Sequence, residues 1–331
     1  MAETTKTTKT TKTTYEWTNR RLLFSPERDT DIDWMDAFAQ APSVLERDTY
    51  LRIYFSCRPK PIDGRYVSYS AYVDVDKRDF SILRVSEEPV LSLGERGTFD
   101  EFGIYPFSAI DAGDEVHAYY GGWTRCTSVP FNVAIGKAVS QDGGKTFERI
   151  GPGPVLSYTL DEPFVLSGPK IRRFGDMWYL FYIAGREWLM HEGKPEPVYK
   201  IRLATSADGV NWVKQERDLI ESIVPDEAQA SPDVFYENGS YHMFFCYRDA
   251  TDYRKNPERT YRLGYASSPD LLNWTRDDDV MRFIRSDVGF DDEMVAYPHT
   301  FVVGGKRYLL YLGNEVGRAG FGIAERKEET T

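Results

Sequence analysis

The stretch PKIRRFGDMWYLFY (residues 169–182) contains the pattern that decides the fold. A proline opens a short apolar strand, Phe174-Gly175-Asp176 makes a tight turn, and an aromatic-rich strand follows. Aromatic and β-branched residues suit a pleated, half-buried surface, and glycine supplies the backbone conformation that short hairpin turns need. The stretch therefore predicts a β-hairpin.

The same pattern occurs five times along the chain. Its copies begin at Pro42, Pro106, Pro169, Pro232 and Pro298, so the spacings are 64, 63, 63 and 66 residues. In each copy we expect a third and a fourth strand to follow, separated by a turn and an aromatic residue. Five four-stranded units of about 64 residues are typical of an all-β, five-bladed β-propeller.

The last copy stops before its fourth strand. The missing pattern, an aromatic residue followed by an apolar pair, occurs instead near the N-terminus as Trp17 and Leu22-Leu23. We therefore expect this N-terminal strand to complete the last blade and close the ring, which removes an exposed sheet edge. Helix is expected only at 215–223, as a turn or two.

Residues 1–14 form a low-complexity Thr/Lys tail that we expect to be disordered, and residues 15–331 are predicted to form one propeller domain. The 331 residues carry a net charge of −11. This acidity argues against nucleic acid as a partner. No apolar run reaches the roughly 20 residues of a membrane span. The three cysteines are expected to be reduced and buried, as in a cytoplasmic protein. The sequence makes no prediction about oligomeric state.

In a propeller, the residues before each innermost strand and those ending each second strand gather at one mouth of the ring. Acidic residues precede all five prolines. These clusters are Asp33 and Asp36, Asp100-Glu101, Asp161-Glu162, Asp226-Glu227 and Asp291-Asp292-Glu293. Carboxyl groups that converge raise one another's pKa, which favours acid–base catalysis. The alternative reading is that they are solvated turn residues or partners in structural ion pairs.

The ends of the second strands carry residues suited to a polyhydroxylated ligand. They are Arg58, Trp123, Arg186, Tyr247 with Arg248, and Asn314. Arginine holds oxygen atoms through planar donors, and aromatic faces can stack against sugar rings. Asp233 and His299 follow their prolines directly, so they face the channel either as ligand contacts or as core. The arginines could equally neutralise an acidic mouth.

Other chemistries find no support in the sequence. There is no HExxH motif, no phosphate-binding loop and no GxSxG elbow, and the four histidines are scattered. We therefore predict neither a metal nor a cofactor.

At this point the sequence resembles a known group of propellers. It looks like the glycoside hydrolases of the invertase and arabinanase/xylosidase type, and it is more similar to the "glycosylase" proteins encoded among bacterial surface-polysaccharide genes. The segments that carry the resemblance include Asp33-Trp34-Met35, Ala39-Gln40-x-Pro42, Gly97-Thr98-Phe99-Asp100, Asp161-Glu162-Pro163-Phe164, Gly193-Lys194-Pro195-Glu196-Pro197 and Asp292-Glu293-Met294. The resemblance implies a carbohydrate substrate. In the hydrolases, however, carboxylates lie next to the strand proline, whereas here the preceding residues are Ala41, Tyr105, Gly168, Ser231 and Tyr297.

The leading hypothesis is a glycoside hydrolase in which one carboxylic acid protonates the glycosidic oxygen and a carboxylate activates water or attacks the sugar. Glu162 or Glu227 is predicted as the acid, and Asp33 or Asp100 as the base or nucleophile. The predicted substrate contacts are Asp36, Gln40, Arg58, Glu101, Trp123, Arg186, Asp233, Tyr247, Arg248, Glu293, His299 and Asn314. The alternatives are a glycosyltransferase or glycoside phosphorylase, and a carbohydrate-binding propeller without catalysis.

Overall fold

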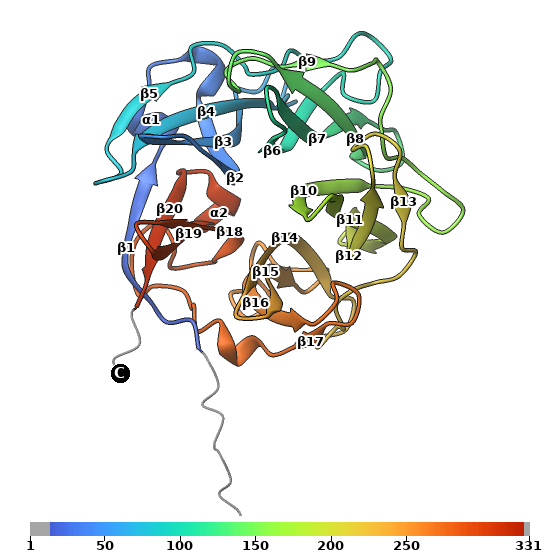
Figure 1. The fold of residues 1–331 in the computed structure, drawn as a ribbon. Helices are drawn as coiled ribbons and strands as arrows, with labels where there is room; N and C mark the ends of the chain where they lie inside the picture. The colour runs from blue at the N-terminus through green and yellow to red at the C-terminus, as the bar shows by residue number, and fades with distance from the viewer. Residues whose placement is uncertain (1–13, 328–331) are drawn as a thin grey trace, which may run out of the picture.

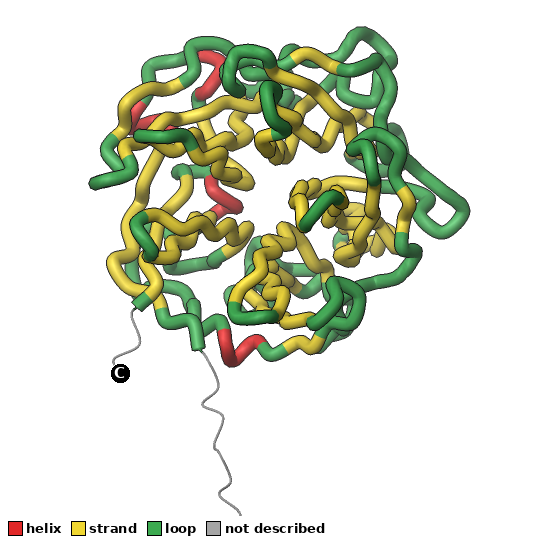
Figure 2. Tube along the Cα trace, in the orientation of Figure 1, coloured by secondary structure: helices red, strands yellow, loops and turns green. Residues whose placement is uncertain are grey.

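The computed structural model describes residues 14–327 and shows five four-stranded antiparallel sheets arranged in a ring (Figure 1). Strands and loops make up nearly all of this part of the chain (Figure 2). The prediction of an all-β, five-bladed propeller is confirmed. The predicted disordered tail lies almost entirely outside the described residues.

The blades follow the order of the sequence repeats, and each runs outward from an inner strand at the channel. Blade 1 contains β2 (Ala37–Glu46), β3 (Tyr50–Arg58), β4 (Tyr69–Asp76) and β5 (Ile82–Val85). Blade 2 contains β6 (Gly103–Asp111), β7 (Val116–Arg125), β8 (Phe131–Ser140) and β9 (Glu148–Arg149). Blade 3 contains β10 (Leu166–Phe174), β11 (Met177–His191), β12 (Lys194–Ser206) and β13 (Val213–Lys214). Blade 4 contains β14 (Ala228–Glu237), β15 (Ser240–Arg248), β16 (Arg262–Ser268) and β17 (Thr275–Arg276).

Blade 5 is built from both ends of the chain. It contains β18 (Ala296–Val303), β19 (Lys306–Leu312), β20 (Phe321–Arg326) and β1 (Trp17–Phe24). β1 pairs antiparallel with β20, with Trp17 opposite Arg326 and Leu22 opposite Gly322. Figure 1 shows this closure as the blue strand beside the red one. The predicted ring closure is confirmed.

Helical structure is limited to single turns in the described part of the chain. These turns are α1 (Pro26–Asp29), α2 (Asn314–Gly317) and two 3-10 turns, η1 (Asp33–Met35) and η2 (Asp278–Val280). The prediction of helix at 215–223 is wrong, because this stretch extends along β12 and donates backbone hydrogen bonds from Gln215 to Leu203 and from Leu219 to Ile201. None of the helices among the described residues is long and apolar enough to span a bilayer.

The prolines that revealed the repeat mark an irregularity in every inner strand. The pairing of the inner strand with its neighbour shifts register in all five blades at this point. In four blades the residue before the proline has a positive φ, namely Ala41 (52°), Gly168 (60°), Ser231 (52°) and Tyr297 (53°). In blade 2 the Tyr105–Pro106 bond is cis. A β-bulge re-aims side chains, so the residue before each proline helps to decide what the channel mouth presents.

The turns between the third and fourth strands are held by aspartates, as expected for structural residues. Asp208 accepts hydrogen bonds from the backbone N–H groups of Val210 and Asn211 at 2.8 Å each, and Asp142 and Asp270 do the same in their blades. Against the effect of burial, the Ser140 hydroxyl and the backbone N–H groups of Thr146 and Lys145 hold the pKa of Asp142 at about 2, below its usual range.

Two cysteines are buried and free, as predicted: Cys57 and Cys246. The prediction that Cys126 is also buried is wrong, since it is exposed. The reason is that Cys126 begins the loop between β7 and β8, on the mouth side of the ring.

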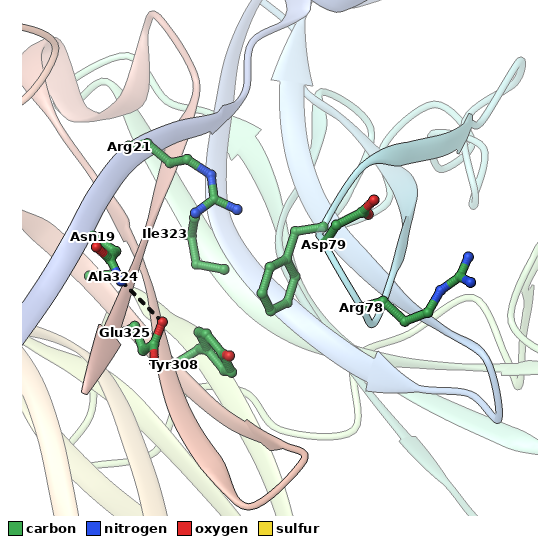
Figure 3. Close-up of a pocket in the computed structure, with 9 residues that line it drawn as sticks. Asn19, Arg21, Arg78, Asp79, Tyr308, Ile323, Ala324 and Glu325 are labelled. Atoms are coloured by element: carbon green, nitrogen blue, oxygen red, sulfur yellow. Dashed lines mark hydrogen bonds between the residues drawn. The ribbon is translucent and has the colours of Figure 1, made fainter. Parts of the chain in front are cut away.

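Where β1 closes the ring, a cavity of about 230 Å³ lies between blade 5 and the β4–β5 turn of blade 1. Figure 3 shows Arg21 of β1, Tyr308 of β19 and Asp79 of the turn around it, with Asn19 bonded to Glu325 at 3.3 Å. This cavity is on the outside of the ring, away from the inner strands.

Candidate active site

A much larger cavity, about 1130 Å³, occupies the mouth of the ring. Every blade contributes to its wall. The lining residues are Phe38, Gln40 and Arg58 of blade 1, Tyr105 and residues 126–131 of blade 2, residues 190–197 and Tyr199 of blade 3, Arg248, residues 252–255 and Tyr261 of blade 4, and Glu293, Met294, Tyr297, Glu315 and Val316 of blade 5. A volume of this order accommodates a ligand of a few sugar rings.

A buried polar cluster joins four of the inner strands. Asp233 of β14 accepts hydrogen bonds from the backbone N–H and the hydroxyl of Thr300, at 2.7 and 2.8 Å, and is ion-paired with Arg172 of β10. His299 of β18 lies 3.1 Å from Asp233, and Lys170 of β10 contacts the carbonyl of Pro42 in β2 at 3.3 Å. Asp233, His299 and Lys170 are all buried.

Both ring nitrogens of His299 have close partners. The backbone N–H of Val44 donates to Nε2 at 3.0 Å, and Nδ1 lies 3.1 Å from Asp233 and 3.2 Å from the Lys170 ammonium. Burial and the Lys170 ammonium lower the pKa of His299 to about 4, and burial lowers the pKa of Lys170 to about 8. Asp233 and His299, two predicted substrate contacts, therefore belong to this buried cluster and do not line the cavity.

The predicted catalytic carboxyls are placed differently from one another, and none of them lines the cavity. Asp33 is exposed in η1. Asp100, Glu162 and Glu227 are fully buried at the outer side of their blades. Asp100 accepts hydrogen bonds from Arg149 at 2.8 Å and from the Tyr120 hydroxyl at 3.0 Å.

The same arrangement recurs in four blades. Glu162 is bound by Arg202 at 2.9 Å, by Lys214 and by the Tyr182 hydroxyl at 2.8 Å. Arg276 lies 2.8 Å from Glu227, and in blade 5 Arg20 and the Tyr311 hydroxyl bind Asp291. In each case the acid precedes the inner strand of a blade, and the cation comes from the outer half of the same blade. The acidic repeat is thus matched by a basic repeat, and the two form ion pairs within the fold.

Of the predicted substrate contacts, Gln40, Arg58, Arg248 and Glu293 line the cavity. Asn314 lies just behind Glu293 and accepts a hydrogen bond from its backbone N–H at 2.8 Å. The others lie elsewhere. Two of them are in ion pairs, Asp36 with Lys60 at 3.6 Å and Arg186 with Asp218. Two make hydrogen bonds: Glu101 accepts one from the Gly97 N–H at 2.8 Å, and Trp123 donates one to the Ser68 hydroxyl at 2.6 Å. The ring of Tyr247 packs 4.3 Å from the Arg276 guanidinium.

Arg248 is built into the wall. It is buried, and its guanidinium donates to three carbonyls, those of Asp249, Ala250 and Pro197, and to the hydroxyls of Tyr199 and Tyr261. All its donors are therefore used by the protein. It braces the β11–β12 hairpin against blade 4 and shapes the cavity without offering a free donor to a ligand.

The β11–β12 hairpin is the longest in the protein, and its tip forms part of the rim. The tip is tied to the loop after β15 by three side-chain pairs, each 2.8 Å long: His191 with Asp252, Glu192 with Lys255, and Glu196 with Arg254. His191, Glu192 and Asp252 offer ligand atoms within 4.8 Å of one another. The adjacent Lys255 and Arg259 already compensate these carboxylates, so the set does not fit a metal ion.

Unusual backbone conformations gather at the cavity. Six non-glycine residues that line it have a positive φ: Phe38, Glu192, Asp252, Tyr297, Glu315 and Val316. Such conformations cost free energy, most of all for a β-branched residue such as Val316, and they concentrate at functional sites. Together with its volume and polar lining, this marks the cavity as the candidate active site.

Several lining residues were missed by the sequence reasoning. Tyr105 and Tyr297 occupy the position directly before the repeat prolines, so their place at the mouth could have been read from the repeat. The contributions of the β7–β8 loop, the β11–β12 tip and the loop after β15 have no such signal, because they lie outside the repeated pattern.

No family model matches this chain. It is 35% identical to the uncharacterized protein Rv1502 of Mycobacterium tuberculosis over 310 residues, which cover 93% of this chain and 98% of that protein. The chain belongs to the Rv1502 family. The alignment covers nearly the whole of both proteins, so the ring is common to the family.

Two further likenesses extend beyond the Rv1502 family. A β-1,2-mannobiose phosphorylase of Thermoanaerobacter is 26% identical over 176 residues, 50% of this chain and 54% of that enzyme. A solved structure described as a glycoside hydrolase superposes with a TM-score of 0.74 at 16% identity, covering 96% of this chain and 93% of that one. The resemblance to glycoside hydrolase propellers is therefore confirmed at the level of the fold.

Proposed function

We propose that this member of the Rv1502 family is a carbohydrate-active enzyme that cleaves or transfers a glycosidic bond in the mouth cavity. The observation that carries the proposal is the cavity itself, which brings free carboxylates, a free arginine and tyrosine side chains together among residues with strained backbone. The likeness to a mannobiose phosphorylase and to glycoside hydrolase propellers supports the same class of chemistry.

Glu293 and Glu315 are our candidates for the catalytic carboxyls. The other acids of the cavity each have a side-chain partner at 2.8 Å: Lys255 for Glu192, Arg254 for Glu196 and His191 for Asp252. Glu315 has a single, longer contact, 3.7 Å to Arg318, while the Glu293 carboxylate makes no ion pair or hydrogen bond with any described residue. Acid–base catalysis on a glycoside needs a carboxyl group that is free to exchange its proton with the substrate.

The catalytic role that the sequence predicts for Asp33, Asp100, Glu162 and Glu227 stays a prediction. The cations around Asp100, Glu162 and Glu227 favour a structural role for these three, because each charge is already compensated inside its own blade. Asp33 is exposed to solvent and does not line the cavity, so it does not contact a substrate bound there.

The test compares Glu293→Gln and Glu315→Gln with wild type on a panel of oligosaccharides, with and without inorganic phosphate. Glu88→Gln, which changes an exposed acid outside the cavity, is the matched control. We expect turnover to fall by about 100-fold or more in at least one cavity variant, and to stay at the wild-type level in Glu88→Gln. Full activity in both cavity variants would exclude these two residues as catalysts.

A second candidate function is carbohydrate binding without catalysis. It is favoured by one specific observation: the inner-strand residues that face the cavity, Phe38, Gln40, Tyr105 and Tyr297, include no carboxylate. Glycan binding with no product formed, and with equal affinity in wild type and Glu293→Gln, would support this function over the enzymatic one.

A further inference from the structure

Arg58 differs from the other buried and partly buried arginines in the described part of the chain. Each of the others makes an ion pair or donates a hydrogen bond, as in Arg52 with Asp74 or Arg125 with the carbonyl of Tyr66. The Arg58 guanidinium makes neither to any described residue, although it comes from the end of β3 and lines the mouth cavity. The side chain is therefore held in place without using its five donors.

Aromatic faces hold Arg58. Its guanidinium lies 4.6 Å from the centroid of the Phe38 ring and 5.4 Å from that of Tyr66. Phe38 reaches this position because β2 bulges between Ala37, which pairs with Arg58, and Gln40, which pairs with Ser56. Cation–π contacts orient a guanidinium but do not neutralise its charge.

The surroundings of Arg58 leave its charge uncompensated. Burial lowers the pKa of Arg58, and the groups that oppose this effect are the phenols of Tyr105, Tyr66 and Tyr297. Burial also raises the pKa of Tyr105 and Tyr297, so both remain neutral O–H groups that can donate hydrogen bonds but cannot balance a cation. No carboxylate of the cavity comes within ion-pair distance, although the protein as a whole is acidic.

A planar guanidinium with free donors, flanked by phenol hydroxyls in a cavity, matches a phosphate or carboxylate group. We infer that Arg58, with Tyr105 and Tyr297, forms an oxyanion-binding site inside the mouth cavity. This inference rests on the proposed function only in placing the oxyanion beside the glycoside. The oxyanion is either free inorganic phosphate, used as a second substrate, or an acidic group on the sugar.

The experiment measures binding, so it does not depend on turnover. Wild type, Arg58→Met and Arg58→Lys are titrated calorimetrically with inorganic phosphate and, separately, with glucuronate, in buffer of constant ionic strength. Arg65→Met, which changes an exposed arginine outside the cavity, is the matched control. We expect saturable phosphate binding in wild type and Arg65→Met, weakened at least about tenfold in Arg58→Met and partly retained in Arg58→Lys.

Glucuronate binding that depends on Arg58, without phosphate binding, would support the site and assign the oxyanion to the sugar. Binding of neither probe, or binding that survives in Arg58→Met, would overturn the inference. Melting curves without any anion guard against misfolding: Arg58→Met leaves no hydrogen-bond or ion-pair partner behind and loses only the contacts with Phe38 and Tyr66, so it should melt cooperatively and close to the wild-type temperature. Glycan turnover with no Arg58-dependent anion binding would leave the proposed function standing and remove only this site.

Discussion

At the scale of single residues, charge compensation separates the structural acids from the candidate catalytic ones. Glu162 shows the first case, since Arg202, Lys214 and the Tyr182 hydroxyl surround its fully buried carboxylate. Glu293 shows the second, because only its backbone is held, by Asn314 and Arg285. Removing one partner of a buried ion pair leaves an uncompensated charge, which is more costly than the pair itself is stabilising.

The change Glu162→Gln should therefore affect stability and not chemistry. We expect its free energy of unfolding to fall by about 3–5 kcal/mol, measured by urea denaturation, while activity per folded molecule stays at the wild-type level. The neighbouring Asp161, half-exposed and bonded to the same arginine at 2.6 Å, gives the control, since Asp161→Asn should cost about 1 kcal/mol or less. Lost activity with unchanged stability in Glu162→Gln would instead favour the catalytic role predicted from the sequence.

At the scale of elements, the fold depends on one strand that is far from its sheet in sequence. β1 covers the edge of β20 and carries Leu23 and Phe24 into the core, where Phe24 packs 4.9 Å from Phe55 of blade 1. The closing strand thus contacts both neighbouring blades. Without it, β20 would present an unpaired edge, which favours aggregation.

Two truncations test this role of β1. Removal of residues 1–13 should leave the melting temperature unchanged, because these residues have no apolar side chain beyond Met1 and Ala2. Removal of residues 1–24 should abolish cooperative melting or yield aggregates in size-exclusion chromatography. A truncation to residue 25 that still melts cooperatively as a monomer would show that the ring holds without its closing strand.

At the scale of the whole molecule, a buried polar cluster ties four inner strands together. Its charged and titratable members are Asp233, Arg172, Lys170 and His299, contributed by three inner strands, and β2 contributes the Val44 N–H and the Pro42 carbonyl. The low pKa of His299, about 4, means that the folded protein resists its protonation while the unfolded chain takes up the proton near pH 6.5.

Stability should therefore fall as the pH is lowered from about 6.5 to about 4, because in this window the unfolded state binds more protons than the folded state. The contribution of His299 to the slope approaches about 1.4 kcal/mol per pH unit. The pKa of Asp233 is held well below its usual range by His299 and Arg172. Protonation of Asp233 therefore lowers the stability of the folded state further only below about pH 4. Unfolding free energies of wild type and His299→Gln between pH 4 and 8 measure the difference. A slope between pH 4 and 6.5 that is as steep in His299→Gln as in wild type would contradict this assignment.

The sequence by itself determined the ring. Five copies of one hairpin pattern, spaced by 63–66 residues, and a displaced fourth-strand pattern at Trp17–Leu23 were enough to predict the blades and their closure, because strand formation depends on local patterning. The repeat also located the mouth, and with it Arg58, Arg248 and Glu293 as residues of the cavity, while Gln40 came from a segment of the family resemblance.

Only the tertiary structure decided which charges are free. Asp100 and Arg149 are 49 residues apart in the chain, and Glu227 and Arg276 are equally distant, yet each pair cancels inside a blade. The bulge that turns Phe38 toward Arg58, and the loops that carry Glu293 and Glu315 to the rim, likewise follow from packing between distant segments. The residue type determines the charge of a side chain. Whether that charge is neutralised or remains available to a ligand depends on which side chains the folded ring brings within a few ångströms of it.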